Sequence, residues 1–163
     1  DQGYLPPARQ GVHCIGASFG PGDAHIDERA TEHRHNNAML QQALPDLDLT
    51  RSDDDWPGHV ALRCNSNDYL PVAGMLPALE RFNQRYDRIR HDRKQVIDSP
   101  APVRPGLAVL TSLGSRGLSA APLAAEILVD QLLGTVPPVP RYLQRAIAPA
   151  RFAERALKRG TPL

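Results

Sequence analysis

The segment from residue 106 to residue 134 constrains the fold more than any other part of the chain. Residues 106–113 (GLAVLTSL) form a β-rich run, the loop sequence GSRG follows, and residues 120–133 are apolar nearly all round. This order predicts a strand, a glycine loop and a buried helix that Gly134 ends. Such a loop offers free backbone N–H groups and the positive end of a helix dipole, which suit a phosphate or an electron-rich ring oxygen. Glycine at a turn also has a purely geometric use, so the pattern alone assigns no ligand.

Three other helical stretches are predicted from periodicity and stop signals. Residues 30–44 form a polar helix that Pro45 stops. Residues 76–94 carry apolar side chains at steps of three and four, with arginines on the opposite face. A last helical segment follows the proline-rich connector 136–140, is interrupted at Pro149 and ends at Gly160.

Three short strands are predicted in the first part of the chain, at residues 3–5, 11–19 and 59–64. Residues 59–64 alternate, with Val60, Leu62 and Cys64 on one face. Arg63 lies on the other face, where an arginine needs a carboxylate partner from the protein or from a ligand. A salt bridge to Asp68 and a ligand carboxylate are equally good interpretations.

Composition excludes several classes of protein. The chain has 163 residues, 41% of them hydrophobic, and a net charge of +1, so a uniformly disordered polymer is not expected. No apolar run reaches the roughly 18 residues of a membrane span, and no signal peptide is visible, so the default compartment is the cytoplasm. The start at Asp1, without methionine, suggests a piece of a longer protein. Two cysteines are too few for a disulfide-stapled fold and are expected to be buried thiols.

The charges are segregated although they nearly cancel. Residues 23–55 hold nine acids and three bases, whereas residues 81–94 hold six bases and two acids and residues 141–159 hold six bases and one acid. A basic segment is where a polyanion would bind first, although a solvated helix face explains the same pattern.

Other chemical motifs are not indicated. The dinucleotide fingerprint GxGxxG is absent, and Ser115 lacks the spacing of a nucleophile elbow. His33 and His35 are two residues apart on a predicted helix and so do not share a face, which argues against a metal site. The aspartates at 53–55 lack the alternating ligands of a calcium loop.

The order of four segments resembles a known family. GYLPP, GVHCIGASF, HVALRCNSNDYLPVAG and GLAVLTSLGSRGLSAAPLAAEIL resemble the C-terminal part of amino-acid-oxidase-type flavoproteins, the group with glycine oxidase and sarcosine oxidase. More narrowly, GSRGL, the following APLAAE and the closing PARF with a basic end resemble the FAD-dependent oxidoreductase domain of the bifunctional tRNA 5-methylaminomethyl-2-thiouridine biosynthesis family, MnmC. The resemblance spans nearly the whole chain and is loosest across residues 80–104.

The resemblance implies a fold and a division of the chain. It implies an α+β piece with mostly antiparallel strands of a substrate domain at residues 1–105, including the arginine-rich helix at about 76–94. Residues 106–134 would then be the last strand, loop and helix of an FAD domain, and residues 135–163 a proline linker with a basic tail.

The resemblance also implies an activity. In this family FAD oxidises the carboxymethylaminomethyl group of a wobble uridine in tRNA to an aminomethyl group, and a separate methyltransferase domain uses S-adenosylmethionine. Arg63 is the first choice for the residue that binds the substrate carboxylate, and Arg116 is the second. The flavin would be held by Gly114, Ser115, Arg116, Gly117 and Leu118. Phosphates of the tRNA would be bound by Arg81, Arg85, Arg88, Arg90, Arg93 and Lys94.

Two features differ from a complete enzyme of this kind. The ADP-binding βαβ unit and the methyltransferase domain are absent, so most of the FAD site is expected outside this chain, and the isolated chain is expected to lack oxidase activity. Two alternatives remain: an oxidase of glycine- or sarcosine-type amines, and a non-catalytic basic module that binds RNA or protein.

Overall fold

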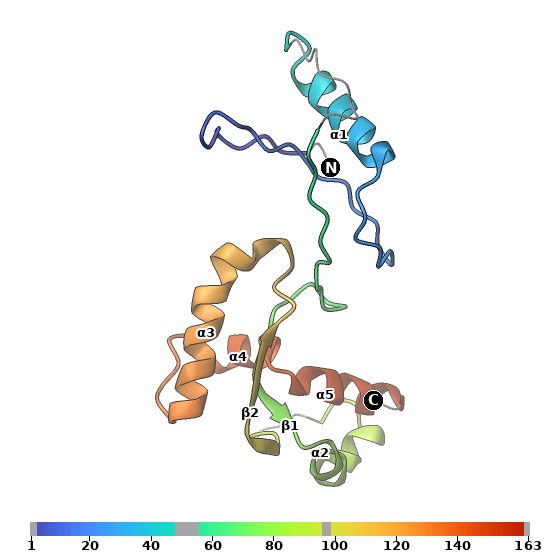
Figure 1. The fold of residues 1–163 in the computed structure, drawn as a ribbon. Helices are drawn as coiled ribbons and strands as arrows, with labels where there is room; N and C mark the ends of the chain where they lie inside the picture. Colours follow the sequence, from blue (N-terminus) through green and yellow to red (C-terminus); the bar gives the residue numbers. More distant parts are fainter. Residues whose placement is uncertain (1–2, 48–55, 96–98, 162–163) are drawn as a thin grey trace. The chain divides into compact units, whose positions relative to one another are not determined.

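The computed structural model describes residues 3–47, 56–95 and 99–161 (Figure 1). The aspartates at 53–55 lie outside these residues. The chain divides into two compact units, residues 1–62 and 63–163, which are described separately. The functional domain boundaries predicted after residues 105 and 134 do not coincide with this division, and they stay a prediction.

The described residues of the first unit, 3–47 and 56–62, form one helix and extended, irregular segments. Helix α1, Ala30–Ala43, forms as predicted and ends before Pro45, with Leu40 as its buried residue. The strands predicted at 3–5 and 11–19 are wrong as continuous strands. Only isolated bridges form there, between Tyr4 and Gly16 and between Arg9 and Val12.

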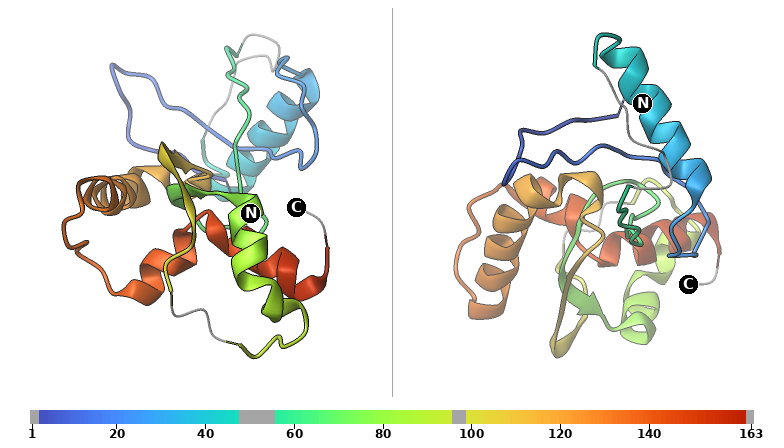
Figure 2. Two further views of the ribbon diagram at one scale, coloured as in Figure 1. Left: turned by 90° about the horizontal axis from the view of Figure 1, so that it is seen from below. Right: turned by 45° about the horizontal axis from the view of Figure 1, so that its top comes forward.

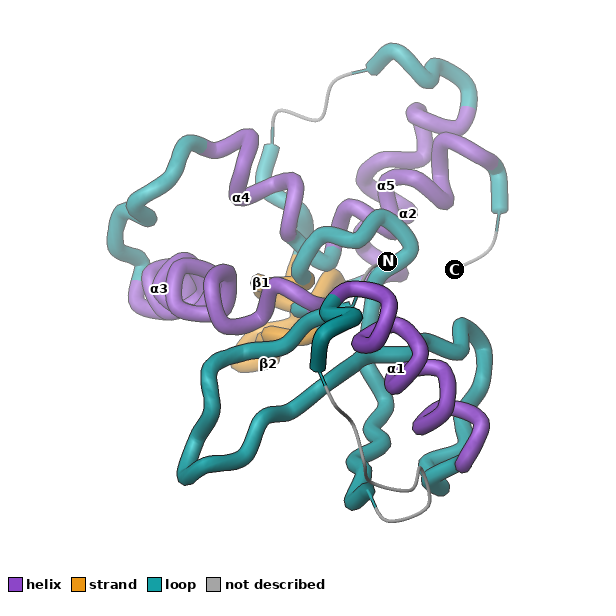
Figure 3. The backbone as a smooth tube through the Cα atoms, turned by 90° about the horizontal axis from the view of Figure 1, so that it is seen from above, coloured by secondary structure: helices purple, strands orange, loops and turns teal. Residues whose placement is uncertain are grey.

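The second unit is built on a two-stranded antiparallel sheet, drawn in orange in Figure 3. Strand β1, Val72–Pro77, pairs with β2, Val103–Thr111, with Val72 opposite Thr111 and an irregularity between Met75 and Pro77. Strand β2 confirms the predicted β-run but begins three residues earlier and ends at Thr111. The strand predicted at 59–64 is wrong, since no strand forms there and Leu62 is 64% exposed.

The described residues of this unit form four α-helices, α2 to α5. Helix α3 lies on one side of the sheet, and α2 and α5 lie on the other (Figure 1, Figure 2). Their bounds are α2 Leu79–Tyr86, α3 Gly117–Leu133, α4 Arg141–Ile147 and α5 Ala150–Arg159, and a 3-10 turn, η2, follows α2 at Asp87–Arg90. All four agree with the predicted helical stretches, except that residues 76–77 belong to β1 and the C-terminal half of the stretch 76–94 is not α-helical.

The core of the second unit lies between α2, η2 and α5. Phe82, Tyr86 and Ile89 pack against Ala153 and Leu157, and the rings of Phe82 and Tyr86 meet edge to face at 4.8 Å. The apolar stripe predicted on residues 76–94 is therefore the buried face of α2 and η2, and the arginines point away from this core.

Helix α3 ends as predicted, with Gly134 in the left-handed conformation at φ +72°. It is not the buried helix that its composition predicted. Only Ala124 and Ile127 are buried, whereas Leu118 is 100% and Leu133 is 73% exposed. None of the helices in the described ranges is long and apolar enough to cross a membrane.

The α+β prediction is confirmed: the described residues form five α-helices and a two-stranded antiparallel sheet. The cysteines differ from expectation. Cys14 and Cys64 are both free, but both are exposed instead of buried.

Candidate functional site

The loop between β2 and α3 has the backbone geometry of a tight strand-to-helix turn. Ser112 and Gly114 both have positive φ, +55° and +59°, and a short 3-10 turn, η3 (Gly114–Arg116), leads directly into α3. No side chain caps the N-terminus of α3, because the N-cap residue is Arg116, whose guanidinium has no acceptor atom. The first backbone N–H groups of α3 are thus without a side-chain partner, as a site for an electron-rich ligand requires.

A second segment, residues 63–66, lies against this loop. Asn65 forms an isolated antiparallel bridge with Leu113, and the Cys64 sulfur lies 3.4 Å from the Ser112 hydroxyl oxygen. The contact is close, since a Cβ at position 114 would lie 2.7 Å from Asn65 Oδ1 and would force the Asn65 side chain to shift. The predicted substrate segment and the predicted flavin loop are therefore neighbours in the fold.

The electrostatics of Cys64 reflect this contact. Hydrogen bonds with the hydroxyls of Ser112, first, and of Thr111 hold the pKa of the Cys64 thiol below its ordinary value. The pKa of this thiol thus reports whether residue 64 is held against residues 111 and 112.

The predicted site residues have the following places. Arg63 is exposed and directly precedes Cys64, on the segment that contacts the loop. Arg116 is exposed in η3, and Leu118 is fully exposed in the first turn of α3. The structure thus brings the segment of Arg63 and the loop of Arg116 together at residues 64–65 and 112–114.

Sequence reasoning missed the partners of Asp68. The Arg151 guanidinium donates from Nε to Asp68 Oδ2 at 2.9 Å and from Nη2 to Asp68 Oδ1 at 3.0 Å, and Arg155 Nη1 lies 2.5 Å from Oδ2. Arg151 above all holds the pKa of Asp68 far below its ordinary range. The carboxylate proposed as one partner for Arg63 is therefore engaged by two arginines of α5.

The basic segment is exposed along its length. All six predicted phosphate-binding side chains are exposed, and they lie on α2 and η2 and just after them: Arg81, Arg85, Arg88, Arg90, Arg93 and Lys94. Arg90 forms an ion pair with Asp87 at 3.2 Å, and the Arg85 guanidinium lies 6.0 Å from the centre of the Tyr86 ring. The segment presents positive charge to solvent but no exposed aromatic ring for base stacking.

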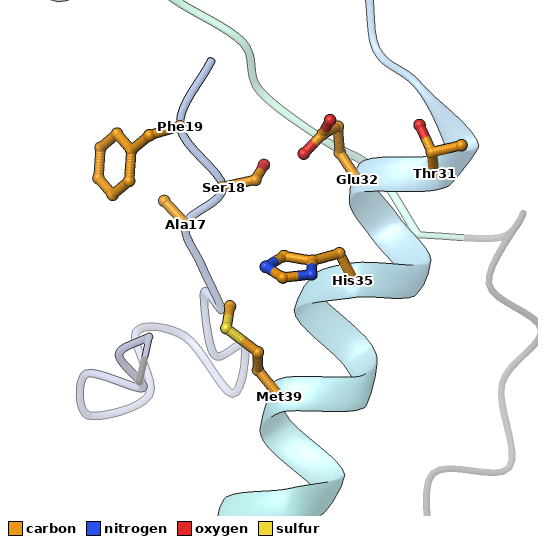
Figure 4. A pocket seen from close by; sticks show the side chains of 7 residues that line it. All are labelled: Ala17, Ser18, Phe19, Thr31, Glu32, His35 and Met39. Atoms are coloured by element: carbon orange, nitrogen blue, oxygen red, sulfur yellow. The ribbon is translucent and has the colours of Figure 1, made fainter. Parts of the chain in front are cut away.

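The first unit has a pocket that sequence reasoning did not single out. It has a volume of about 520 Å³ and lies between residues 17–19 and one face of α1, where Glu32, His35 and Met39 line it (Figure 4). Within the described parts of the chain, no three His, Cys, Asp or Glu residues lie where they could share a metal ion.

Comparison with known proteins gives matches over nearly the whole chain. A protein of Aeromonas salmonicida, described as the tRNA 5-methylaminomethyl-2-thiouridine biosynthesis bifunctional protein MnmC, is 39% identical over 99% of this chain. Proteins of the same description from Aeromonas hydrophila and Pseudomonas fluorescens are 38% and 40% identical over 99% and 98% of it. This chain is homologous to the C-terminal part of the MnmC proteins. No family model matches.

The MnmC relatives are much longer than this chain. The matched region is 24% of the length of the Aeromonas proteins and 25% of the Pseudomonas protein, so the chain spans about a quarter of the relatives that it matches. The resemblance to MnmC that the sequence motifs indicated is confirmed over 98–99% of the chain.

Proposed function

We propose that this chain is part of an FAD-dependent oxidoreductase that removes the carboxymethyl group from 5-carboxymethylaminomethyl-(2-thio)uridine at the wobble position of tRNA. The observation that carries the proposal is the similarity to MnmC, 39% identity over 99% of the chain. The name of these relatives specifies tRNA 5-methylaminomethyl-2-thiouridine biosynthesis by a bifunctional protein. The product in that name is consistent with oxidative loss of a carboxymethyl group. We assign the activity to the cytoplasm, where tRNA is modified.

The residues present fit a flavin on one side of its site. Backbone N–H groups at the uncapped start of α3 would bind electron-rich oxygens of the cofactor, with Gly114, Ser115 and Gly117 allowing close approach and Leu118 contacting it. When bound, FAD supplies the hydride acceptor for oxidation of the methylene carbon next to the amine. The rest of the FAD site would come from outside residues 1–163.

Arg63 would bind and orient the substrate carboxylate. A guanidinium can donate two parallel hydrogen bonds to one carboxylate, which fixes the orientation of an N-substituted glycine. Residues 64 and 65 place Arg63 beside the loop that would hold the flavin. Arg116, within that loop, is the second candidate for the same task.

The remainder of the enzyme would cover the exposed apolar face of α3. Leu123, Val129, Leu132 and Leu133 are exposed, although apolar helices normally bury such side chains. In a protein about four times as long, the dinucleotide-binding part of the FAD domain is the partner we propose for this face. A methyltransferase domain that uses S-adenosylmethionine would account for the second activity of a bifunctional protein.

The exposed arginines after β1 would bind the tRNA backbone. Phosphate contacts of this kind are independent of sequence and weaken with salt. Charge reversal at Arg85, Arg88 and Arg93 in the full-length enzyme should therefore weaken tRNA binding and reduce its salt dependence. The same substitution at Arg9, Arg34 and Arg104, which are exposed elsewhere in the chain, gives the same net charge and is the control. If both triple variants bind tRNA equally, the basic segment is not the tRNA site.

A flavin titration tests the central proposal. The 163-residue chain and a longer polypeptide that also carries a dinucleotide-binding unit are titrated with FAD, and flavin absorbance and fluorescence are followed. We expect binding by the longer form alone, and turnover of carboxymethylaminomethyl-uridine tRNA by that form. Failure of a folded longer form to bind FAD would favour the basic binding module.

Substitution at Arg63 tests its proposed role, and a comparison of substrates separates the tRNA-modifying oxidoreductase from an oxidase of glycine- or sarcosine-type amines. Arg63→Gln in the longer form should raise the KM for tRNA substrate while flavin binding is unchanged, and Arg34→Gln should change neither. Turnover of free glycine or sarcosine in preference to tRNA would favour the simple amine oxidase.

A further inference from the structure

The carboxylate of Asp68 is the centre of a cluster that joins two distant parts of the second unit. The Asp68 cluster consists of Ser66, Asp68, Leu70, Arg151 and Arg155. Ser66 Oγ donates to Asp68 Oδ1 at 2.7 Å, and the Leu70 backbone N–H donates to the same oxygen at 3.2 Å. These bonds close residues 66–70 into a compact turn, in which Tyr69 has φ +58°.

Arg151 fixes this turn to the helices. Besides its two bonds to Asp68, it donates to the Leu70 carbonyl at 3.1 Å and to the Ile147 and Ala148 carbonyls at 2.9 and 3.2 Å. Its side chain is only 6% exposed and stacks on the Phe152 ring at 4.1 Å. A buried, planar donor that satisfies three carbonyls and a carboxylate at once leaves the turn little freedom.

The turn at residues 66–70 directly follows residues 64 and 65, which contact the loop after β2. Ser66 directly follows Asn65 and Cys64, which contact residues 111–114. Residues 59–64 have no strand pairing, so within the described structure local backbone bonding does little to fix this segment. Residues 63–66 are instead held by the contacts of Cys64 and Asn65 with residues 111–113, and by the Asp68 cluster at their C-terminal end.

We propose that Arg151, acting through Asp68, is a positioning residue that holds residues 63–66 in register with the loop at 112–118. The proposal rests on the proposed function, because that function makes residue 63 the carboxylate-binding arginine. Arg151 itself touches neither substrate nor cofactor. Its role is separate from the attachment of α5, which packs on α2 through Ala153 and Leu157 without it.

The thiol of Cys64 is a reporter of this register that needs no flavin. In a Cys14→Ser chain of 163 residues, the rate of thiol alkylation is measured as a function of pH, for Arg151→Met and for Asp68→Asn. Loss of the contact with Ser112 and Thr111 should raise the pH midpoint of alkylation in both variants. A direct effect of charge would act differently: removing the cation raises a thiol pKa, and removing the anion lowers it. A rise in both variants therefore indicates movement of the segment.

Controls keep the test decisive. Lys158→Met breaks an exposed ion pair with Glu154 on the same helix and should leave the midpoint unchanged. If Arg151→Met or Asp68→Asn does not fold, as judged by circular dichroism, Arg151→Lys and Asp68→Glu replace them. These variants should raise the pH midpoint of alkylation by a smaller amount. An unchanged midpoint, or shifts of opposite sign in folded variants, would overturn the proposal.

The longer form gives the functional readout. There Arg151→Lys should raise the KM for tRNA substrate about tenfold with little change in kcat or flavin absorbance. A fall in kcat with unchanged KM would contradict positioning of the carboxylate-binding segment. If the longer form binds no flavin, the proposed function fails, but the alkylation result still stands by itself.

Discussion

Replacement of Gly114 by alanine tests the contact on which the candidate site depends. Gly114 has φ +59°, a conformation that L-residues with a side chain rarely adopt. A Cβ at this position would also lie 2.7 Å from Asn65 Oδ1, well inside van der Waals contact. Gly114→Ala therefore introduces backbone strain and a clash with the segment that carries Arg63.

Each of these effects has an expected size. The left-handed conformation costs about 1–2 kcal/mol for a residue with a Cβ. Overpacking adds about 1–3 kcal/mol, and the lower end applies because Asn65 is exposed and its amide can shift. We expect Gly114→Ala to lower the free energy of unfolding by about 2–3 kcal/mol. Gly106 is a matched control, because it has φ +71° and a Cβ added there would meet no atom within 4 Å, so Gly106→Ala should cost only the backbone strain.

A double-mutant cycle isolates the clash. Urea unfolding of Gly114→Ala, Asn65→Ala and the double variant is followed by circular dichroism, whose helical signal comes mostly from the second unit. Removing the Asn65 amide should restore about 1 kcal/mol to the Gly114→Ala variant and nothing to Gly106→Ala. If Gly114→Ala and Gly106→Ala are equally destabilised, and the cycle shows no coupling, then the Asn65 side chain does not contact the loop at position 114. The proposed proximity of the Arg63 segment to this loop would then be refuted.

Three further predictions concern other parts of the chain. The pKa of Asp68 is depressed in the folded state, so the contribution of its carboxylate to stability is complete above the ordinary carboxyl pKa of about 3.9 and is lost as pH falls further. Between pH 7 and pH 3, the free energy of unfolding measured in urea should therefore fall more in wild type than in Asp68→Asn. Phe82 is 1% exposed, so Phe82→Ala should cost about 3–5 kcal/mol in thermal or urea unfolding, whereas the exposed Arg88→Ala should stay within about 0.5 kcal/mol. The Arg29 side chain and the His25 N–H lower the pKa of Asp23 to about 2, and an NMR titration should find it returning toward its ordinary value in Arg29→Gln.

The helices were predictable because their signals are local. The ends of α1 and α3 follow from Pro45 and Gly134, and the buried face of α2 follows from the spacing of its apolar side chains. Strand β1 was missed for a physical reason. It contains Gly74 and ends at Pro77, both unfavourable in strands, yet Gly74 is needed because a Cβ there would lie 3.0 Å from the Pro149 ring. That close approach of a helix segment more than 70 residues away is not visible in the local sequence.

The site was predictable only as separate pieces. Sequence motifs placed a glycine loop at 114–117 and an arginine at 63, and the fold brings residues 64 and 65 to that loop. The pair of Asp68 and Arg151 was not predictable, because 83 positions separate them and no local sequence pattern links the two residues.

The same reasoning explains why the burial of α3 was predicted wrongly. A helix that is apolar nearly all round is expected to be covered on every side, yet α3 buries only Ala124 and Ile127 against the rest of the described chain. The side chains of a sequence match the environment of the whole protein in which it works, and the MnmC relatives are about four times as long as this chain. The excess of apolar surface on α3 is therefore what the proposed function requires: one face packs on β1, and the opposite face is left for the part of the enzyme that would complete the flavin site.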